Sequence, residues 1–314
     1  MEIFYWRSDH GNFGDDLNDW LWDFLLPGIR EIENDQLLVG VGTLLNTELL
    51  PAERRKLVIG SGVGYGATPS VADPRLWDVR CVRGPLSARA LGLDDDLGIV
   101  DPAVMVADMP EFAGLEPTGS AIFIPHWETA AYGPWEIPRA CAIAGLRYVS
   151  PCDEARSVIR AIAQAGLVVA ESMHAAILAD AFRVPWIAVA GSRRINAFKW
   201  TDWGETVGIT YDPVRLPLGG RYRGLRAVAR RFGVNLDRLK GTAQSSPVPA
   251  ASGGAARSRR LQSLVRQSLA VPVGLALRRA RSREPQLSPP GRLEERKDRL
   301  RAVLAQVRVE LGLA

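Results

Sequence analysis

The sequence contains little cysteine and little histidine, with three residues of each among 314. Cys81, Cys141 and Cys152 are odd in number and form no CxxC pair, which argues against a disulfide framework and a cysteine-based zinc site. The histidines match no metal-ligand spacing such as HExxH. No apolar run approaches the ~18 residues of a transmembrane helix, and the polar residues 1–16 do not resemble a signal peptide. We therefore expect a reduced, cytoplasmic protein without a metal ion or cofactor.

Positive charge is concentrated near the C-terminus. The net charge is +4, and residues 242–314 hold 14 of the 39 Lys and Arg but only 5 of the 35 Asp and Glu. The preceding body shows no zinc-finger, helix-turn-helix or RNA-binding signature, so we expect no nucleic-acid partner. Residues 242–258, rich in Ser, Ala, Gly and Pro, predict a flexible linker. The arginine-rich residues 259–314 predict a basic helical tail that is solvated, packs on a partner, or holds the protein peripherally on an anionic membrane surface at the inner face.

Short apolar runs alternate with helical patterns along the first 241 residues. We expect strands at residues 2–6, 36–41, 56–59, 78–82, 98–100, 121–124, 167–170 and 185–190, and helices at residues 17–26, 85–91, 154–165 and 173–182. This alternation is typical of α/β proteins with parallel sheets. A Pro- and Gly-rich crossing at residues 110–119 divides the pattern into two Rossmann-like domains, residues 1–115 and 116–241. Ligands of such sheets bind outside the carboxyl ends of the strands or between domains.

Glycine-rich and polar segments follow the first strands. In the first loop, Asn12 and Asp15 are suited to a hydroxylated or anionic ligand and Gly14 permits a tight turn, although an aspartate here also caps helices. Two further loops, at residues 39–43 and 60–64, include Gly42 and Gly62. They match neither a Walker loop nor a dinucleotide fingerprint. Their glycines would nevertheless allow a ligand to approach the backbone closely.

Charged residues also stand at predicted strand ends. Arg83 precedes a helix that begins with proline, where its guanidinium can bind phosphate or carboxylate, or form a salt bridge to a neighbouring carboxylate. Asp101 is either a site residue or a turn-forming aspartate. Lys199 lies among aromatic residues and is a candidate anion contact or a surface cation–π partner.

All three histidines fall at predicted strand-to-helix junctions. A single histidine there often caps a helix, but the shared location of His10, His126 and His174 favours an acid or base among them. His174 is the best placed, because it lies where a buried strand meets a helix of small residues.

Together these segments resemble the polysaccharide pyruvyl transferase family. The resemblance covers about residues 1–212, and its last part is similar to the branch that adds pyruvate ketals to bacterial exopolysaccharides such as succinoglycan. The matching segments are Gly11-Asn12-Phe13-Gly14-Asp15, Val39-Gly40-Val41-Gly42-Thr43, Gly60-Ser61-Gly62-Val63-Gly64, Arg83-Gly84-Pro85-Leu86-Ser87, Asp101-Pro102-Ala103, Pro125-His126, Ser172-Met173-His174-Ala175-Ala176-Ile177, Phe182-Arg183-Val184-Pro185-Trp186 and Lys199-Trp200-Thr201-Asp202-Trp203.

The resemblance implies two Rossmann-like halves in a GT-B-like arrangement. It also implies phosphoenolpyruvate as donor and a sugar diol of an oligosaccharide or lipid-linked saccharide as acceptor. Many relatives carry Arg-Leu-His where this chain has Ser172-Met173-His174, so the histidine is retained and the arginine is absent. The cations that can replace this arginine are Arg83, Arg193, Arg194 and Lys199.

Roles follow from this resemblance and from the chemistry of the side chains. We expect His174 to act as the acid–base residue or as the oxyanion and phosphate partner, and His126 and Asp101 to activate the acceptor hydroxyls. The residues expected to bind the donor are Arg83, Lys199, Asn12, Gly14, Asp15, Gly42, Gly62 and Ser172.

Two other functions are also compatible with the sequence. A GT-B-type glycosyltransferase that uses a nucleotide sugar would share the architecture, with Glu205 as the candidate ligand of the ribose. A non-catalytic module that recruits a polysaccharide assembly complex would explain the missing arginine.

Overall fold

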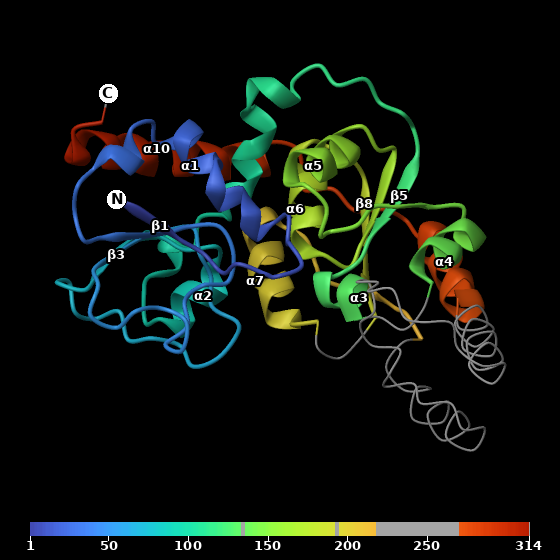
Figure 1. The fold of residues 1–314 in the computed structure, drawn as a ribbon, viewed down its shortest axis with the longest axis horizontal. Coiled ribbons are helices and arrows are strands. Elements are labelled where there is room, and N and C mark those ends of the chain that lie inside the picture. Colours follow the sequence, from blue (N-terminus) through green and yellow to red (C-terminus); the bar gives the residue numbers. More distant parts are fainter. Residues whose placement is uncertain (133–135, 192–194, 218–269, 314) are drawn as a thin grey trace, which may run out of the picture.

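The computed structural model describes residues 1–132, 136–191, 195–217 and 270–313. Two α/β halves lie side by side (Figure 1). We call residues 1–112 the N-terminal half and residues 121–217 the C-terminal half. Each half contains one parallel sheet, which confirms the predicted α/β class.

The N-terminal sheet has four short parallel strands, in the order β1 (Glu2–Phe4), β2 (Leu37–Val39), β3 (Lys56–Ile59) and β4 (Trp77–Cys81). β2 and β3 are buried along their whole length, as expected for parallel strands covered on both faces. The strand expected at residues 98–100 is a single parallel bridge between Gly98 and Val82.

The helical segments of this half are short. The helix expected at residues 17–26 is divided because Trp20, with φ −143° and ψ −20°, leaves the helical conformation between η1 and α1. The 3-10 and α-helices of this half are η1 (Asp15–Asp19), α1 (Leu21–Leu25), η2 (Ile29–Glu31), α2 (Pro85–Ala90), η3 (Asp95–Leu97), η4 (Pro102–Asp108) and η5 (Pro110–Phe112).

The C-terminal sheet has the strand order β6-β5-β7-β8-β9, all parallel. Its strands are β5 (Ala121–Ile124), β6 (Arg147–Tyr148), β7 (Leu167–Ala170), β8 (Trp186–Ala190) and β9 (Val214–Arg215), and its helices are α3 (Trp127–Tyr132), α4 (Ile137–Ala144), α5 (Ala155–Ala163), α6 (Met173–Ala181) and α7 (Ala197–Val207). The sequence did not predict β6 and β9, because two residues are too few to show a strand pattern. The strand order reverses between β5 and β7, which creates a topological switch point at their carboxyl ends.

The described part of the C-terminal segment packs on the body of the protein. Residues 270–281 form a helix, of which Ala270, Val273 and Leu277 are buried in one apolar cluster with α4. Gln286 then forms an antiparallel bridge with Trp186 of β8. The predicted linker, residues 242–258, and residues 259–269 lie outside the described residues.

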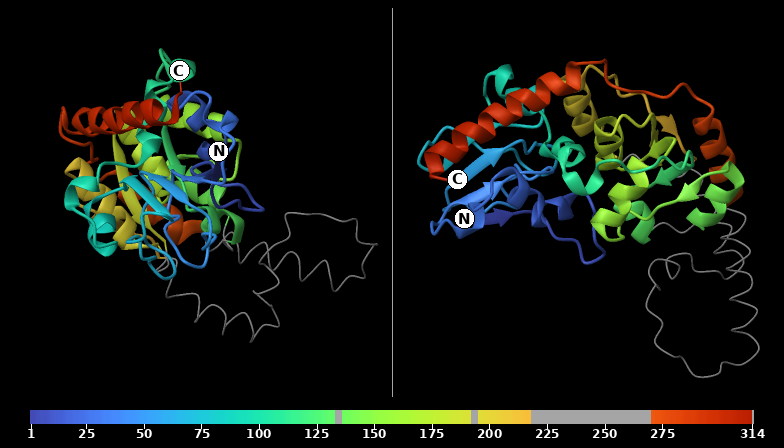
Figure 2. Two further views of the ribbon diagram at one scale, coloured as in Figure 1. Left: turned by 90° about the vertical axis from the view of Figure 1, so that its left-hand side faces the viewer. Right: turned by 90° about the horizontal axis from the view of Figure 1, so that it is seen from above.

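The last helix, α10 (Arg292–Leu311), returns to the N-terminal half (Figure 2). It contacts β4 and η4 of that half and α7 of the other. Leu300 and Leu304 are buried in the main apolar core, and Lys297 of the same helix forms an ion pair with Asp108. The sequence placed residues 259–314 in a separate tail, whereas α10 is an integral part of the fold.

The two halves are also joined directly, because α6 of the C-terminal half packs against η4 of the N-terminal half. One apolar core contains Leu17 and Val104 from the first half and Ala176 from the second. Within the described residues, no helix combines the length and apolar character needed to cross a bilayer.

Candidate active site

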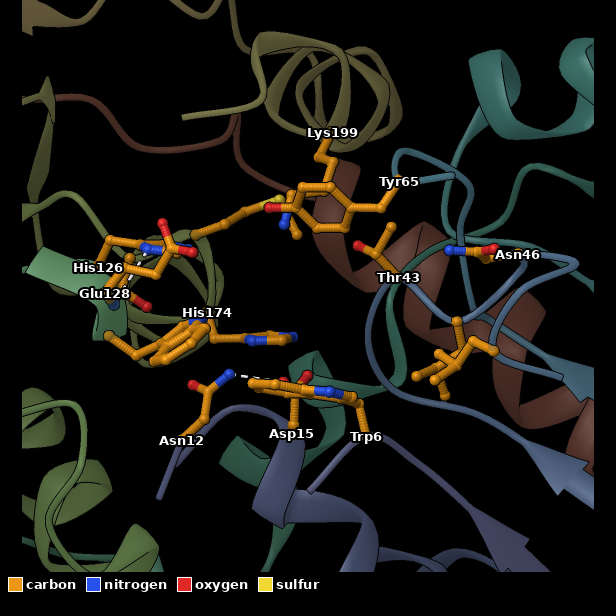
Figure 3. A pocket seen from close by; sticks show the side chains of 15 residues that line it. Trp6, Asn12, Asp15, Thr43, Asn46, Tyr65, His126, Glu128, His174 and Lys199 are labelled. Atoms are coloured by element: carbon orange, nitrogen blue, oxygen red, sulfur yellow. Dashed lines mark hydrogen bonds between the residues drawn. The ribbon is translucent and has the colours of Figure 1, made fainter. Parts of the chain in front are cut away.

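A cavity of about 560 Å³ lies between the two halves. Its walls are formed by loops that follow β1, β2, β3, β5 and β7, together with α7 (Figure 3). The cavity therefore includes the switch point of the C-terminal sheet, where open α/β sheets bind their ligands. The lining residues are Trp6, Asn12, Asp15, Thr43, Leu44, Asn46, Leu49, Tyr65, His126, Trp127, Glu128, Ser172, Met173, His174 and Lys199.

His174 is the second residue of α6, and its side chain is largely buried at the cavity. Gly14, from the opposite half, packs directly against the imidazole. A Cβ atom built on Gly14 would lie 1.9 Å from Nδ1 and 2.4 Å from Cγ of His174, so no larger residue fits there. The sequence predicted Gly14 as a donor-binding residue, and the structure shows that it makes room for the histidine.

Asp101 lies behind His174 and does not line the cavity. It is fully buried at the start of η4, where its Oδ1 atom accepts a hydrogen bond of 3.0 Å from the Ala103 N–H. Its Oδ2 atom lies 3.8 Å from Nε2 of His174, and neither of these two atoms has a hydrogen-bond partner. The carboxylate is therefore buried outside the cavity lining, and the contact of Asp101 with the acceptor stays a prediction.

Asn12 and Asp15 lie together on one wall of the cavity (Figure 3). The Asn12 amide donates a hydrogen bond of 2.5 Å to Oδ2 of Asp15. Burial raises the pKa of the Asp15 carboxyl, and its electrostatic interactions with the neighbouring His174 and Lys199 oppose this shift. Gly42 has a φ of +112°, and a Cβ atom there would lie 3.0 Å from Oδ1 of Asp15. Gly42 therefore accommodates the carboxylate.

Lys199 lines the cavity from α7. Its Nζ atom lies 4.4 Å from the centre of the Tyr65 ring, so the predicted cation–π contact is present with an aromatic residue from the other half. The adjacent Asn196 amide donates a hydrogen bond to the Gly64 carbonyl, which fixes this end of α7 against the N-terminal half. Lys199 is thus held at the cavity while its ammonium group still lines the space.

His126 lines the cavity at the end of β5 and is neutral at ordinary pH. Burial, with a smaller effect of the Lys199 charge, lowers the pKa of His126 to about 3. Its Nδ1 atom accepts a hydrogen bond of 3.3 Å from the Glu128 N–H. In the neutral ring this assigns the remaining proton to Nε2.

Glu171 holds the loops around His126 in place, although it does not line the cavity. This fully buried carboxylate accepts hydrogen bonds from the main-chain N–H groups of His126, at 3.0 Å, and Gly191, at 2.7 Å. Burial raises its pKa, and these hydrogen bonds oppose the shift. It therefore connects the loops that follow β5 and β8. In the sequence, the only indication of a role for Glu171 was its position, directly after a predicted buried strand and before Ser172.

Arg83 also lies outside the cavity lining, with a fully buried side chain. Its Nε atom donates to Asp202 at 3.0 Å, and its two terminal nitrogens donate to the Thr43 hydroxyl and the Val63 carbonyl at 2.9 and 2.8 Å. Of the two roles left open for Arg83, the structure shows the salt bridge. Gly62 makes room for the guanidinium, and in this arrangement Arg83 contacts Thr43 and not the cavity, so its contact with the donor stays a prediction.

The remaining predicted residues are distributed as follows. Ser172 lines the cavity immediately before α6, with no side-chain bond to the helix. His10 is exposed and outside the lining. Arg193 and Arg194 lie outside the described residues. Within the described ranges, no group of three or more His, Cys, Asp or Glu is arranged to hold a metal ion.

Several lining residues belong to none of the motif segments singled out in the sequence, among them Trp6, Tyr65, Trp127 and Glu128. Their positions close to predicted strand ends were the sole indication, and only the approach of the two halves brings them together.

Residues 4–193 match the family described as polysaccharide pyruvyl transferase, and the chain belongs to this family. The protein is thus a transferase by family, and the cavity at the junction of its two halves is its candidate active site. The chain is also 51% identical to the succinoglycan biosynthesis protein ExoV of Rhizobium meliloti (strain 1021), over 98% of this chain and 99% of the relative. This second similarity includes the C-terminal segment that the family match leaves out.

Proposed function

We propose that this protein transfers the pyruvyl group of phosphoenolpyruvate to two hydroxyl groups of one sugar and forms a pyruvate ketal. The acceptor is a repeat unit of an exopolysaccharide, free or lipid-linked. Membership in the family and the similarity to a succinoglycan biosynthesis protein support this assignment. The observation that carries it is the cavity between the halves, in which His174 is backed by Asp101 and Lys199 supplies a positive charge.

The reaction balances with phosphate as the only by-product. The first acceptor hydroxyl adds to the central carbon of phosphoenolpyruvate, while a proton adds to the methylene carbon and converts it to a methyl group. The bond from the central carbon to the phosphate oxygen then breaks. The second hydroxyl takes its place, and its proton leaves with the phosphate. The site therefore has to move protons and hold an anion.

We assign the proton transfers to His174. Asp101 faces Nε2 at 3.8 Å, which favours a proton on that nitrogen and leaves Nδ1 to exchange protons with the reacting groups. A buried carboxylate in this position also stabilises the imidazolium that forms during the transfer.

We assign binding of the anionic donor to Lys199, the Ser172 hydroxyl and the N-terminus of α6. Cations and helix N-termini attract phosphate and carboxylate groups. These groups take over the role of the arginine that many relatives carry before the histidine. Arg193 and Arg194 remain candidates for the same role. His126, with its proton on Nε2, donates a hydrogen bond to the ligand rather than removing a proton.

The alternative of a glycosyltransferase that uses a nucleotide sugar receives little support from the structure. Glu205, the candidate for the ribose, does not line the cavity. Its carboxylate is 42% exposed and lies 3.8 Å from Arg89 on the surface.

Phosphate release tests the proposal. The purified protein is incubated with phosphoenolpyruvate and with succinoglycan fragments from which mild acid has removed the pyruvate. We expect inorganic phosphate to appear only when both are present, with an equal amount of pyruvate gained by the saccharide. Thermal unfolding gives a second readout, since a ligand at 100 times its Kd stabilises the folded state by about 2.7 kcal/mol. Protection by nucleotide sugars but not by phosphoenolpyruvate would support the glycosyltransferase instead.

We also propose that the helix at residues 270–281 docks on an anionic membrane surface, near a lipid-linked acceptor. Its inner side is buried, whereas Val271 and Leu275 are 42% and 55% exposed, and Arg278 and Arg279 are exposed beside them. Apolar and basic residues on one outward side are typical of interfacial helices. α10 is a poorer candidate, because Glu294, Glu295 and Asp298 are exposed on it.

The membrane proposal predicts salt-sensitive binding to vesicles that contain anionic lipid. Each basic residue near such a surface contributes about 1 kcal/mol, so R278E/R279E is expected to weaken binding by about 30-fold or more. R55E/R75E is the control, since it makes the same charge change on the N-terminal half. If both double variants lose vesicle binding equally, the binding reflects the net charge of the protein and the proposed membrane contact of this helix is wrong. Deletion of everything after residue 241 is unsuitable, because it also removes the buried side of α10.

A further inference from the structure

The cavity has more space and more apolar surface than a small anion needs. Its volume of about 560 Å³ lies within the ~300–1,000 Å³ range of pockets that enclose drug-sized ligands. Phosphoenolpyruvate has only three carbons and several negative charges. Its binding leaves a large part of the cavity for the acceptor.

A pair of tryptophans from the two halves forms one part of the wall. Trp6 follows β1 of the N-terminal half, and Trp127 is the first residue of α3 in the C-terminal half. Their ring centres lie 5.1 Å apart at an angle of 46°. Neither ring is fully buried, so both retain surface toward the cavity.

The pair lies next to the residues assigned to chemistry. The Trp127 ring lies 5.9 Å from the His126 ring. Trp6 lies beside Asp15, across the cavity from Lys199 (Figure 3). A ligand placed on these rings would therefore meet polar side chains of both halves.

The chemistry of the indole face selects between the two substrates. An aromatic face carries partial negative charge, which disfavours contact with the anionic donor. A sugar ring presents an apolar face of C–H groups, which pack on aromatic rings and gain weak C–H contacts, while its hydroxyls point outward to polar partners. The tryptophan pair suits a neutral sugar ring and not phosphoenolpyruvate.

We propose that Trp6 and Trp127 form the acceptor subsite, on which one sugar ring of the acceptor stacks with its hydroxyls toward His126 and His174. This inference rests on the proposed function, because it names the part of the cavity that binds the acceptor. Since each half contributes one ring, the subsite is complete only when the halves are together.

Steady-state kinetics with each substrate varied in turn test this inference. We expect W6A and W127A to raise the KM for depyruvylated succinoglycan fragments by about tenfold or more, as for buried aromatic contacts. The KM for phosphoenolpyruvate should stay within twofold of the wild-type value. The stabilisation of the protein against thermal unfolding by phosphoenolpyruvate should also be unchanged. W6F and W127F keep a ring and should lose much less. W20A is the matched control, because Trp20 is also half-buried but packs against Phe112 outside the cavity lining.

Two results would overturn the inference: an unchanged KM for the saccharide in W6A and W127A, or an equal rise of the KM for both substrates. Calorimetric titration of the same saccharide fragments measures the subsite without turnover. If the wild-type protein binds these fragments, and W6A does not, the subsite stands even where no phosphate is released. The failure of the proposed function is then distinguishable from failure of the subsite.

Discussion

Turnover of the H174A variant is expected to fall by about 10²–10⁴-fold, the usual contribution of a general acid–base residue. The reason is geometric: His174 lines the cavity, and the Asp101 carboxylate lies 3.8 Å from its Nε2 atom. Phosphate release at saturating concentrations of both substrates measures this change. The KM for the saccharide should change much less than turnover, since the sugar ring of the acceptor is assigned to Trp6 and Trp127.

The control for this variant is H10A. His10 is exposed and does not line the cavity, so turnover should be retained. H174A should also remain folded, because the lost imidazole makes no hydrogen bond through Nε2. A folded H174A protein with near-normal turnover would contradict the assignment of the proton transfers.

The G14A variant is expected to lose activity by about 100-fold or more, although the substitution adds a single methyl group. That methyl would lie 1.9 Å from Nδ1 of His174, so the ring must move, and a misplacement of ~1 Å can cost about 10²-fold in rate. Overpacking of this kind also destabilises a protein by about 1–3 kcal/mol. The backbone is not the cause, since Gly14 has φ −73° and ψ −43°, a conformation that alanine adopts readily.

The double variant G14A/H174A separates this steric cause from a general disturbance of the loop. Without the imidazole, the closest remaining approach is 2.8 Å, to Cβ of residue 174. Most of the destabilisation caused by G14A should therefore disappear in the H174A background, as chemical denaturation would show. Full additivity of the two stability changes would mean that Gly14 and His174 are not coupled.

The fold class and the position of the candidate site could be predicted, because both depend on local patterns. Buried apolar strands with polar or glycine residues directly after them indicate parallel sheets and the edge where ligands bind. Asn12, His126, Ser172 and His174 all stand at such strand ends, and all line the cavity.

The functions of individual charged and glycine residues could not be predicted in the same way. Whether Arg83 meets a ligand or a carboxylate depends on Asp202, which is distant in sequence and reaches it only after folding. Gly14 and Gly62 resemble ligand-binding glycines in the sequence, yet each makes room for a side chain of this protein. Burial and long-range pairing decide these roles, and neither is encoded in a local motif.

The return of α10 to the first half also has a consequence for synthesis. Residues 293, 300, 304 and 307 of this helix complete the apolar core in which residues of the N-terminal half are buried. On the ribosome, that half emerges before α10 and lacks this cover until residues 292–311 are also available. Nascent chains therefore carry exposed apolar surface for most of their elongation, a state prone to aggregation. Chaperone binding to the chain should therefore persist until α10 is free to pack on the N-terminal half.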